Sequence, residues 1–189
     1  GRFYSPQQVF NALTKEAEKH GHKIISASAS EGTLGKEHLL ELLTLVNKSK
    51  YVFVLETNGI TLGHDIEYIR SLSKFKNLHV RVSIKGTNKK EYNTLTGAES
   101  ISYDLPFQAL KNLIDFNISC NACLMISFST QKNINEAKNK LSNVWPGLLK
   151  SLELEHITLF PKVASRLKNA NLMPRKFRHR GNIINFKER

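Results

Sequence analysis

Polar side chains that can bind a small molecule follow two apolar, β-branched runs near the middle of the chain. The first run, 52–55, leads into Glu56, Thr57 and Asn58. The second run, 79–84, contains Ser83 and leads into Lys85. In parallel sheets, ligands bind just past the carboxyl ends of the strands, which is where these polar groups lie. We therefore take these five residues as candidate ligand-binding residues.

The two apolar runs are predicted to be neighbouring strands, because a helical stretch of residues 65–76 separates them. Strands are predicted at about residues 23–28, 51–55, 79–84, 119–126 and 154–160. Helical patterns separate all of these strands. Such alternation predicts an α/β fold with a mostly parallel sheet, and five strands are too few to close an eight-stranded barrel. We expect a partial (β/α) barrel whose strand ends share one rim.

Composition limits the class of protein. The 189 residues carry a formal net charge of +12, which favours a polyanionic partner. No apolar run is long enough to cross a membrane, and no signal segment opens the chain. Two cysteines are too few for a disulfide framework and indicate the cytoplasm or another reducing compartment.

The last segment, 173–189, differs from the rest of the chain. It is basic, lacks a helical period and contains Phe177 and Phe186 among its cations. Cations with interspersed aromatic rings suit phosphate contacts and base stacking, although a solvated terminus is the simpler interpretation. We predict a barrel over residues 1–172 and a basic tail over 173–189 that contacts RNA or a ribonucleoprotein. The candidate nucleic-acid-binding residues are Arg175, Lys176, Arg178, Arg180, Lys187 and Arg189.

Three motifs resemble a known family. The loop 28–35, Ser-Ala-Ser-Glu-Gly-Thr-Leu-Gly, precedes a leucine-rich helix and resembles the second-strand loop of radical S-adenosylmethionine (SAM) enzymes. The sequence 56–59, Glu-Thr-Asn-Gly, resembles their third-strand exit. Segment 80–98 is similar to the fourth-strand segment of a group common in archaea. The order and spacing of these motifs extend the resemblance over about residues 1–172.

The resemblance implies a fold, two cofactors and a site. The fold is a partial (β/α)₆ barrel, in which three cysteines hold a [4Fe–4S] cluster that reductively cleaves SAM to a radical. Glu31 would lie in the loop that binds the amino end of SAM. The residues that would face the cofactor are Glu56, Thr57, Asn58, Ser83 and Lys85.

The chain departs from the family at two places. The cluster motif Cys-x₃-Cys-x₂-Cys is absent, and the family places it just upstream of residue 1. A longer native protein would explain this absence, whereas a second defect in the same cofactor site points instead toward a degenerate member of the family. Cys120 and Cys123 lie three apart on a predicted strand and point to opposite faces. We therefore predict no metal site and no cluster in this chain. The family's Gly-Gly-Glu-Pro loop is replaced by Ala29, Ser30, Glu31 and Gly32, which keeps only the glutamate.

Three functions stay open at this point. The chain is part of a radical SAM enzyme, or an inactive radical-SAM-like barrel (a pseudoenzyme) that binds RNA or a ribonucleoprotein. It could also be a SAM-binding protein without redox chemistry. The sequence identifies no catalytic residue, substrate or oligomeric state, and fold alone does not decide between these functions.

Overall fold

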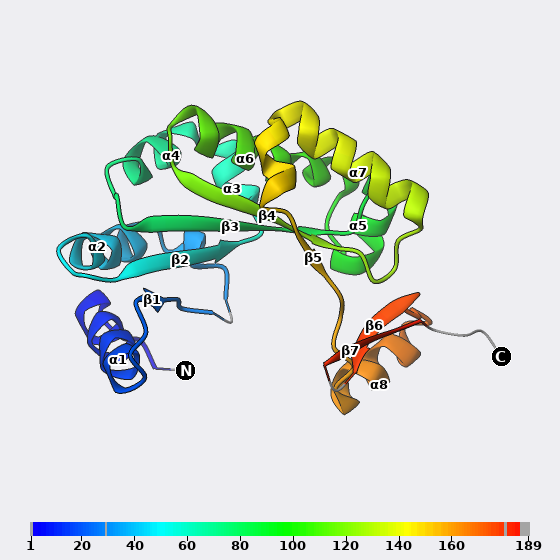
Figure 1. Ribbon diagram of the computed structural model, residues 1–189, viewed down its shortest axis with the longest axis horizontal. Helices are drawn as coiled ribbons and strands as arrows, with labels where there is room; N and C mark the ends of the chain where they lie inside the picture. The colour runs from blue at the N-terminus through cyan, green and yellow to red at the C-terminus, as the bar shows by residue number, and fades with distance from the viewer. Residues whose placement is uncertain (1, 29, 180, 186–189) are drawn as a thin grey trace. The chain divides into compact units, whose positions relative to one another are not determined.

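The computed structural model describes residues 2–28, 30–179 and 181–185. The chain divides into two compact units, shown with their elements in Figure 1. Unit 1 contains Gly1–Ser83 and Asp104–Asn121, and unit 2 contains Ile84–Tyr103 and Ala122–Arg189. The domain boundary predicted after residue 172 stays a prediction.

The main sheet confirms the predicted fold class. Its strands are β1 (Ile24–Ile25), β2 (Val52–Thr57), β3 (Leu78–Lys85), β4 (Ser119–Met125) and β5 (Glu153–Glu155). They are hydrogen-bonded in the order β1-β2-β3-β4-β5, and pairing is parallel between β1 and β2, β2 and β3, and β4 and β5. Helices alternate with the strands, as in a partial (β/α) barrel.

Helices separate the strands of the main sheet, as predicted. Unit 1 contains α1 (Pro6–Lys19), the 3₁₀ helix η1 (Gly32–Leu34), α2 (Lys36–Asn47), α3 (Ile60–His64), α4 (Ile66–Leu72) and α6 (Leu105–Asp115). Unit 2 contains α5 (Lys89–Thr96), α7 (Gln131–Val144), the 3₁₀ helix η3 (Pro146–Lys150) and α8 (Pro161–Asn169), and η2 spans Ser100–Asp104. The helix predicted over 65–76 was wrong in its bounds. Asp65 begins α4 by accepting a hydrogen bond from Tyr68 N at 2.8 Å, and α4 ends at Leu72.

The core of unit 1 lies between its strands and α3, α4 and α6. Along β3, residues alternate between buried and half-buried, so that Leu78, Val80 and Val82 enter the core. Gly63 lets α3 approach α6 closely, because a Cβ there would overlap the carbonyl of Leu105. Asn112 Nδ2 then donates to Leu62 O at 3.1 Å inside this packing.

The strand predicted over 154–160 ends early in unit 2. β5 stops at Glu155, and residues 157–159 instead pair with the segment predicted to be the basic tail. Thr158 forms a parallel bridge with Arg178, and Arg178 N donates to Ile157 O at 2.8 Å. The pairing is parallel because α8 connects the two segments as a crossover.

The tail also contains two short strands that the sequence did not predict. β6 (Lys176–His179) and β7 (Asn182–Asn185) form an antiparallel hairpin. Backbone N–H groups of Arg175 and Lys176 donate to Ser127 O at 2.7 and 3.1 Å, which attaches the beginning of the hairpin to unit 2. Within the described ranges, no helix has the length and apolar character needed to cross a bilayer.

Candidate functional site

The Glu31 carboxylate joins the loop after β1 to the end of β2. Its Oε1 accepts hydrogen bonds from the hydroxyls of Thr33 and Thr57, each at 2.7 Å, and from Thr33 N at 3.4 Å. Its Oε2 accepts one from Asn58 N at 2.7 Å. We call these four residues the Glu31 cluster. Thr33 and Thr57 are buried, and their hydroxyl groups find their hydrogen-bond acceptor in the Glu31 carboxylate.

The turn after β2 keeps Asn58 at the surface. Thr57 Oγ1 accepts a hydrogen bond from Gly59 N at 3.0 Å, and Asn58 Oδ1 accepts one from Ile60 N at 2.9 Å. Gly59 has a φ of 76°, and a Cβ there would lie 2.9 Å from Val82 Cγ1. Only glycine fits this turn without strain. The sequence Thr-Asn-Gly therefore forms a fixed turn in which Asn58 is exposed.

Glu56 and Ser83 lie on the opposite face of the strands from Thr57, because side chains alternate along a strand. Glu56 is the direct cross-strand neighbour of Arg81, and Arg81 Nη1 lies 3.3 Å from Glu56 Oε1. The Glu56 side chain is 44% exposed and that of Arg81 is 19% exposed. Ser83 follows Arg81 on the same half-buried face of β3. We call these three residues the Glu56 face.

Arg81 was missed by the sequence reasoning, which stopped at the residues after the apolar runs. The period of two along β3 was the available signal, because Arg81 lies two residues before Ser83. Of the six predicted SAM-binding residues, Glu31, Thr57 and Asn58 form one cluster, while Glu56 and Ser83 share another face. Lys85 belongs to unit 2, where its Nζ lies 3.6 Å from Glu155 Oε2.

Unit 2 contains a second carboxylate that joins two loops. Glu91 Oε2 accepts hydrogen bonds from Thr87 N at 2.9 Å, Thr87 Oγ1 at 2.8 Å and Ser129 Oγ at 2.7 Å, and Oε1 accepts one from Asn133 Nδ2 at 3.2 Å. We call these four residues the Glu91 cluster. Burial by itself would raise the pKa of Glu91, but the hydrogen bonds outweigh burial and lower it. The cluster fixes the loops that follow β3 and β4.

The cysteines do not fit a [4Fe–4S] cluster. The chain contains two, Cys120 and Cys123, and both lie in β4 without forming a disulfide. Burial raises the pKa of Cys120 to about 11. Two cysteines are fewer than the thiolates that hold a [4Fe–4S] cluster. Among the residues that the structure describes, no group of three or more histidines, cysteines and acids can hold a metal ion.

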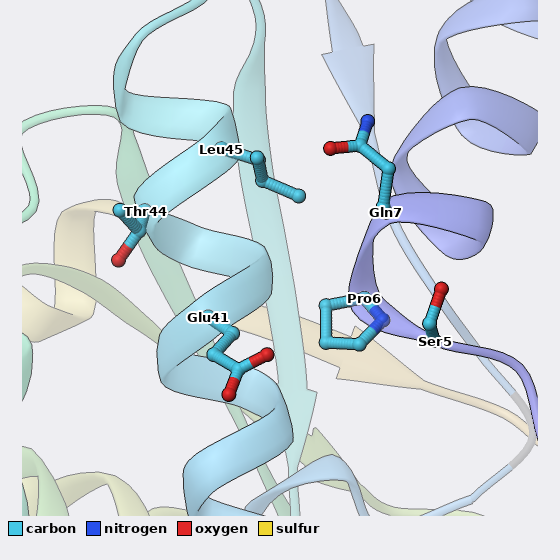
Figure 2. Close-up of a pocket in the computed structure, with 6 residues that line it drawn as sticks. All are labelled: Ser5, Pro6, Gln7, Glu41, Thr44 and Leu45. Carbon is cyan, nitrogen blue, oxygen red and sulfur yellow. The ribbon is translucent and has the colours of Figure 1, made fainter.

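A groove of about 370 Å³ separates α1 from α2 in unit 1 (Figure 2). The groove is lined by the N-cap Ser5 with Pro6 and Gln7 of α1, and by Glu41, Thr44 and Leu45 of α2. Ser5 is already engaged in a capping box with Gln8, through bonds of 2.8 and 3.2 Å. The groove lies between helices and away from the strand ends, so we assign it no ligand.

Comparison with known proteins decides the family. The model of the radical SAM superfamily matches residues 1–141. This chain belongs to the radical SAM superfamily. A search of curated proteins finds no match to the sequence.

Solved structures support the same fold. Streptococcus suis SuiB bound to S-adenosylmethionine has a TM-score of 0.63 at 15% identity, over 76% of this chain and 32% of that one. SuiB bound to its precursor peptide SuiA gives 0.62 at 16% identity, over 76% and 31%. Native anSMEcpe with bound AdoMet gives 0.54 at 20% identity, over 87% and 50%. At these identities the likeness establishes the fold, and the chain spans a third to a half of the length of these structures.

Proposed function

We propose that unit 1 of this radical SAM chain binds SAM through the Glu56 face. The methionine end of SAM carries an ammonium, a carboxylate and a sulfonium, and its ribose carries hydroxyls. Glu56 supplies an acceptor for cationic and hydroxyl groups, and Arg81 supplies a forked donor for the carboxylate. The cross-strand pairing of Glu56 with Arg81 at 3.3 Å is the observation that carries the proposal.

The Glu31 cluster has a positioning role in this proposal. By accepting four hydrogen bonds, Glu31 fixes the loop after β1 against the end of β2 before any ligand arrives. Preorganised loops bind more tightly because less ordering is required on association. Direct contacts of SAM with Glu31, Thr57, Asn58 and Lys85 stay predictions from the resemblance.

The proposal is limited to binding. In this superfamily a bound [4Fe–4S] cluster supplies the electron that cleaves SAM, and the two cysteines of this sequence are fewer than the thiolates that such a cluster takes. In this proposal, Glu56 and Arg81 bind the oppositely charged groups of SAM on one face of β2 and β3.

Isothermal titration calorimetry with SAM tests the proposal. The variant Glu56→Gln removes a charged hydrogen-bond acceptor, so SAM affinity is expected to fall about tenfold to a hundredfold. Ser83→Ala removes one hydroxyl and is expected to cost about fivefold. Glu67→Gln serves as the control, because Glu67 is an exposed acid of α4 that pairs with Arg70 at 3.2 Å.

The proposal is wrong if the wild-type protein gives no binding heat with SAM at about 1 mM. A dissociation constant above about 1 mM would be too weak for a specific site. It is also wrong if Glu56→Gln and Ser83→Ala bind SAM as the wild type does. Thermal unfolding of each variant separates a lost contact from lost folding. S-adenosylhomocysteine, which lacks the positive sulfonium, is expected to bind less tightly.

A second function, binding of single-stranded RNA, is favoured by the charge pattern of unit 2. Residues 156–185 contain seven lysines and arginines and no acidic residue. Lys162, Arg166 and Lys168 are exposed on α8, and the tail residues Arg175, Lys176 and Arg178 are exposed as well. A run of cations without compensating acids suits contact with phosphates. The predicted contacts Arg180, Lys187 and Arg189 lie outside the described residues.

His156 reports the positive field of this region. Burial lowers its pKa, and the positive charges of Lys176 and Arg178 lower it further. Within the described part of the chain, His156 Nδ1 is a buried atom without a hydrogen-bond partner. The positive charges of Lys176 and Arg178 therefore act at His156 and favour its neutral form, and a bound phosphate group would offset those charges.

Fluorescence anisotropy with a single-stranded oligouridine at increasing salt tests this second function. Replacing Arg175, Lys176 and Arg178 by methionine is expected to reduce the slope of log affinity against log salt by about 2, since each phosphate contact on a single strand contributes about 0.7. The control replaces Lys15, Lys19 and Lys23 of unit 1. Equal slopes in both triple variants would remove the tail from the interface.

A further inference from the structure

Phe160 is an exposed aromatic residue of unit 2 that the RNA function proposed above does not use. Its side chain is 64% exposed. The sequence indicated Phe177 and Phe186 as the aromatic residues of the basic tail. In the structure Phe177 is half-buried in β6, and Phe186 lies outside the described residues. Among the described residues of 156–185, Phe160 is therefore the phenylalanine whose ring is open to a ligand.

Strand register brings Phe160 close to the cations of the tail. Thr158 lies directly opposite Arg178 in a parallel bridge, and Arg178 O accepts a hydrogen bond from Leu159 N at 3.4 Å. Phe160 N donates in turn to Thr158 O at 3.0 Å. Phe160 therefore lies only two residues along the chain from the residue that faces Arg178.

Two cations share one face of the hairpin formed by β6 and β7. Lys176 and Arg178 are two residues apart in β6, so their side chains leave the strand on the same face. Both side chains are exposed. Because a strand rises about 3.3 Å per residue, their Cα atoms are about 6.6 Å apart. This spacing allows the two side chains to contact successive phosphates of one single strand.

His156 gives independent support for the closeness of the tail cations to segment 156–160. Burial lowers the pKa of His156, and the charges of Lys176 and Arg178 lower it further. His156 precedes Thr158 by two residues, so the electrostatic influence agrees with the register of the bridge. Residues 156–185 contain no acidic residue, so no carboxylate of this segment competes with an anionic ligand.

The backbone of Phe160 is fixed before any ligand binds. Phe160 O accepts a hydrogen bond from Ala164 N at 2.9 Å, and Phe160 N is bonded to Thr158 O. Pro161 follows at the first position of α8 and restricts Phe160 to extended backbone, with a φ of −70° and a ψ of 155°. Only the two side-chain torsions of Phe160 need to be ordered when a flat group stacks on the ring, so the entropic cost is low.

We propose that Phe160 stacks on a base of single-stranded RNA while Lys176 and Arg178 bind its phosphates. Every base has a flat π face, so stacking on Phe160 adds affinity without requiring a particular sequence. Phosphate contacts by themselves do not distinguish a nucleic acid from another polyanion, whereas stacking requires bases. This inference rests on the RNA function proposed above and adds the recognition of bases to it.

Two probes with the same backbone test the inference without any substitution. Oligouridine carries bases, and an abasic oligomer of equal length carries the same ribose and phosphate groups without them. In fluorescence anisotropy, the wild type is expected to bind oligouridine about fivefold to a hundredfold more tightly than the abasic oligomer, the factor for one stacked base. The salt dependence of binding is expected to be the same for both probes, because they present the same phosphates.

Substitutions at Phe160 assign this difference to its ring. Phe160→Leu keeps an apolar side chain but removes the ring, so the preference for oligouridine over the abasic oligomer is expected to disappear. Phe160→Trp keeps an aromatic ring and is expected to retain the preference. Because Phe160 is exposed, neither substitution opens a cavity in the core. Phe3→Leu is the matched control, since Phe3 is a fully exposed phenylalanine of unit 1, and it is expected to behave as the wild type does.

Failure of the RNA function and failure of this inference give different results. If the wild type binds neither probe, the RNA function is wrong and the inference fails with it. If the wild type binds both probes equally and with a clear salt dependence, the RNA function stays supported and stacking is wrong. If Phe160→Leu keeps the preference of the wild type for oligouridine, the base stacks elsewhere and the role given to Phe160 is wrong.

Vesicles that contain phosphatidylserine separate RNA from a lipid surface, which would also attract exposed cations and apolar side chains. A lipid surface accepts leucine as readily as phenylalanine, so it gives no reason for Phe160→Leu to differ from Phe160→Trp. Binding of the wild type to these vesicles without binding to oligouridine would assign this surface to a membrane and overturn the inference.

Discussion

The Glu31 cluster of unit 1 and the Glu91 cluster of unit 2 use the same chemistry in different surroundings. Each carboxylate accepts four hydrogen bonds from backbone N–H groups and from threonine, serine or asparagine side chains. Glu31 lies in an irregular loop after β1, a strand of two residues at the sheet edge. Glu91 lies in the first turn of α5, where its own N–H donates to Asn88 Oδ1 at 2.9 Å.

This difference shows that the number of hydrogen bonds does not determine what a half-buried carboxylate contributes to stability. A segment that can open by itself loses its hydrogen bonds without unfolding the unit, whereas a residue within a packed helix unfolds with it. We expect Glu91 to contribute mainly to global stability. Glu31 is expected to contribute mainly to the order of one loop, and through that loop to ligand binding.

The largest expected effect is on the stability of Glu91→Gln. Glutamine keeps the shape but loses the charge, and hydrogen bonds to charged groups contribute about 1.5–3 kcal/mol. The free energy of unfolding in urea at pH 7 is expected to fall by about 2 kcal/mol. Glu99→Gln, an exposed acid of the same unit, is the control and should lie within about 0.5 kcal/mol of wild type. Equal stabilities of wild type and Glu91→Gln would contradict the comparison.

The second prediction concerns acid. The pKa of Glu91 is lower in the folded chain than the value of about 4.3 expected in the unfolded chain. Its stabilising contribution is therefore present above about pH 4.3 and is lost as pH falls through the folded-state pKa. The gap in unfolding free energy between wild type and Glu91→Gln should narrow below that pH. At about pH 2.5, acids with ordinary pKa values of about 3.9 to 4.3 are protonated. If the difference in unfolding free energy between wild type and Glu91→Gln stays constant down to that pH, the charge of Glu91 does not cause the difference.

The smallest expected effect on global stability is that of Glu31→Gln, at less than about 1 kcal/mol, because the loop can open alone. Its local effect is expected to be clear. Amide exchange of Thr33 and Asn58, whose N–H groups donate to Glu31, should become faster while exchange in β3 stays unchanged. A loss of global stability as large as that of Glu91→Gln would show that the two clusters are equivalent.

Much of the fold followed from local patterns. The alternation of β-branched runs with helical stretches predicted the parallel sheet, because residues such as Val80 and Val82 repeat with a period of two. The strand predicted over 154–160 was wrong in its bounds, because β5 ends at Glu155. An apolar run does not show where the neighbouring strand stops pairing with it. The hairpin of β6 and β7 was also missed, because its exposed isoleucines carry no amphipathic pattern.

The candidate site was predicted in composition but not in arrangement. The sequence identified one loop residue and five residues at strand ends: Glu31, Glu56, Thr57, Asn58, Ser83 and Lys85. In the structure, the alternation of side chains along β2 places Glu56 and Thr57 on opposite faces. It did not indicate that Glu31 bonds to Thr57, because the two residues lie 26 positions apart and no local rule relates them. Arg81 and Glu155 became visible as partners only through the register of neighbouring strands and the ion pair of Lys85.

The sequence by itself determined the superfamily, the alternation of strands and helices in the main sheet and the kinds of chemical group available, because these depend on local periodicity and motif spacing. The tertiary structure decided which of those groups meet. Hydrogen bonds and ion pairs act over about 3 to 4 Å, so their partners depend on strand register and loop path rather than on position along the chain. The same side chains therefore form a structural cluster around Glu31, a charged face at Glu56 and an ion pair at Lys85.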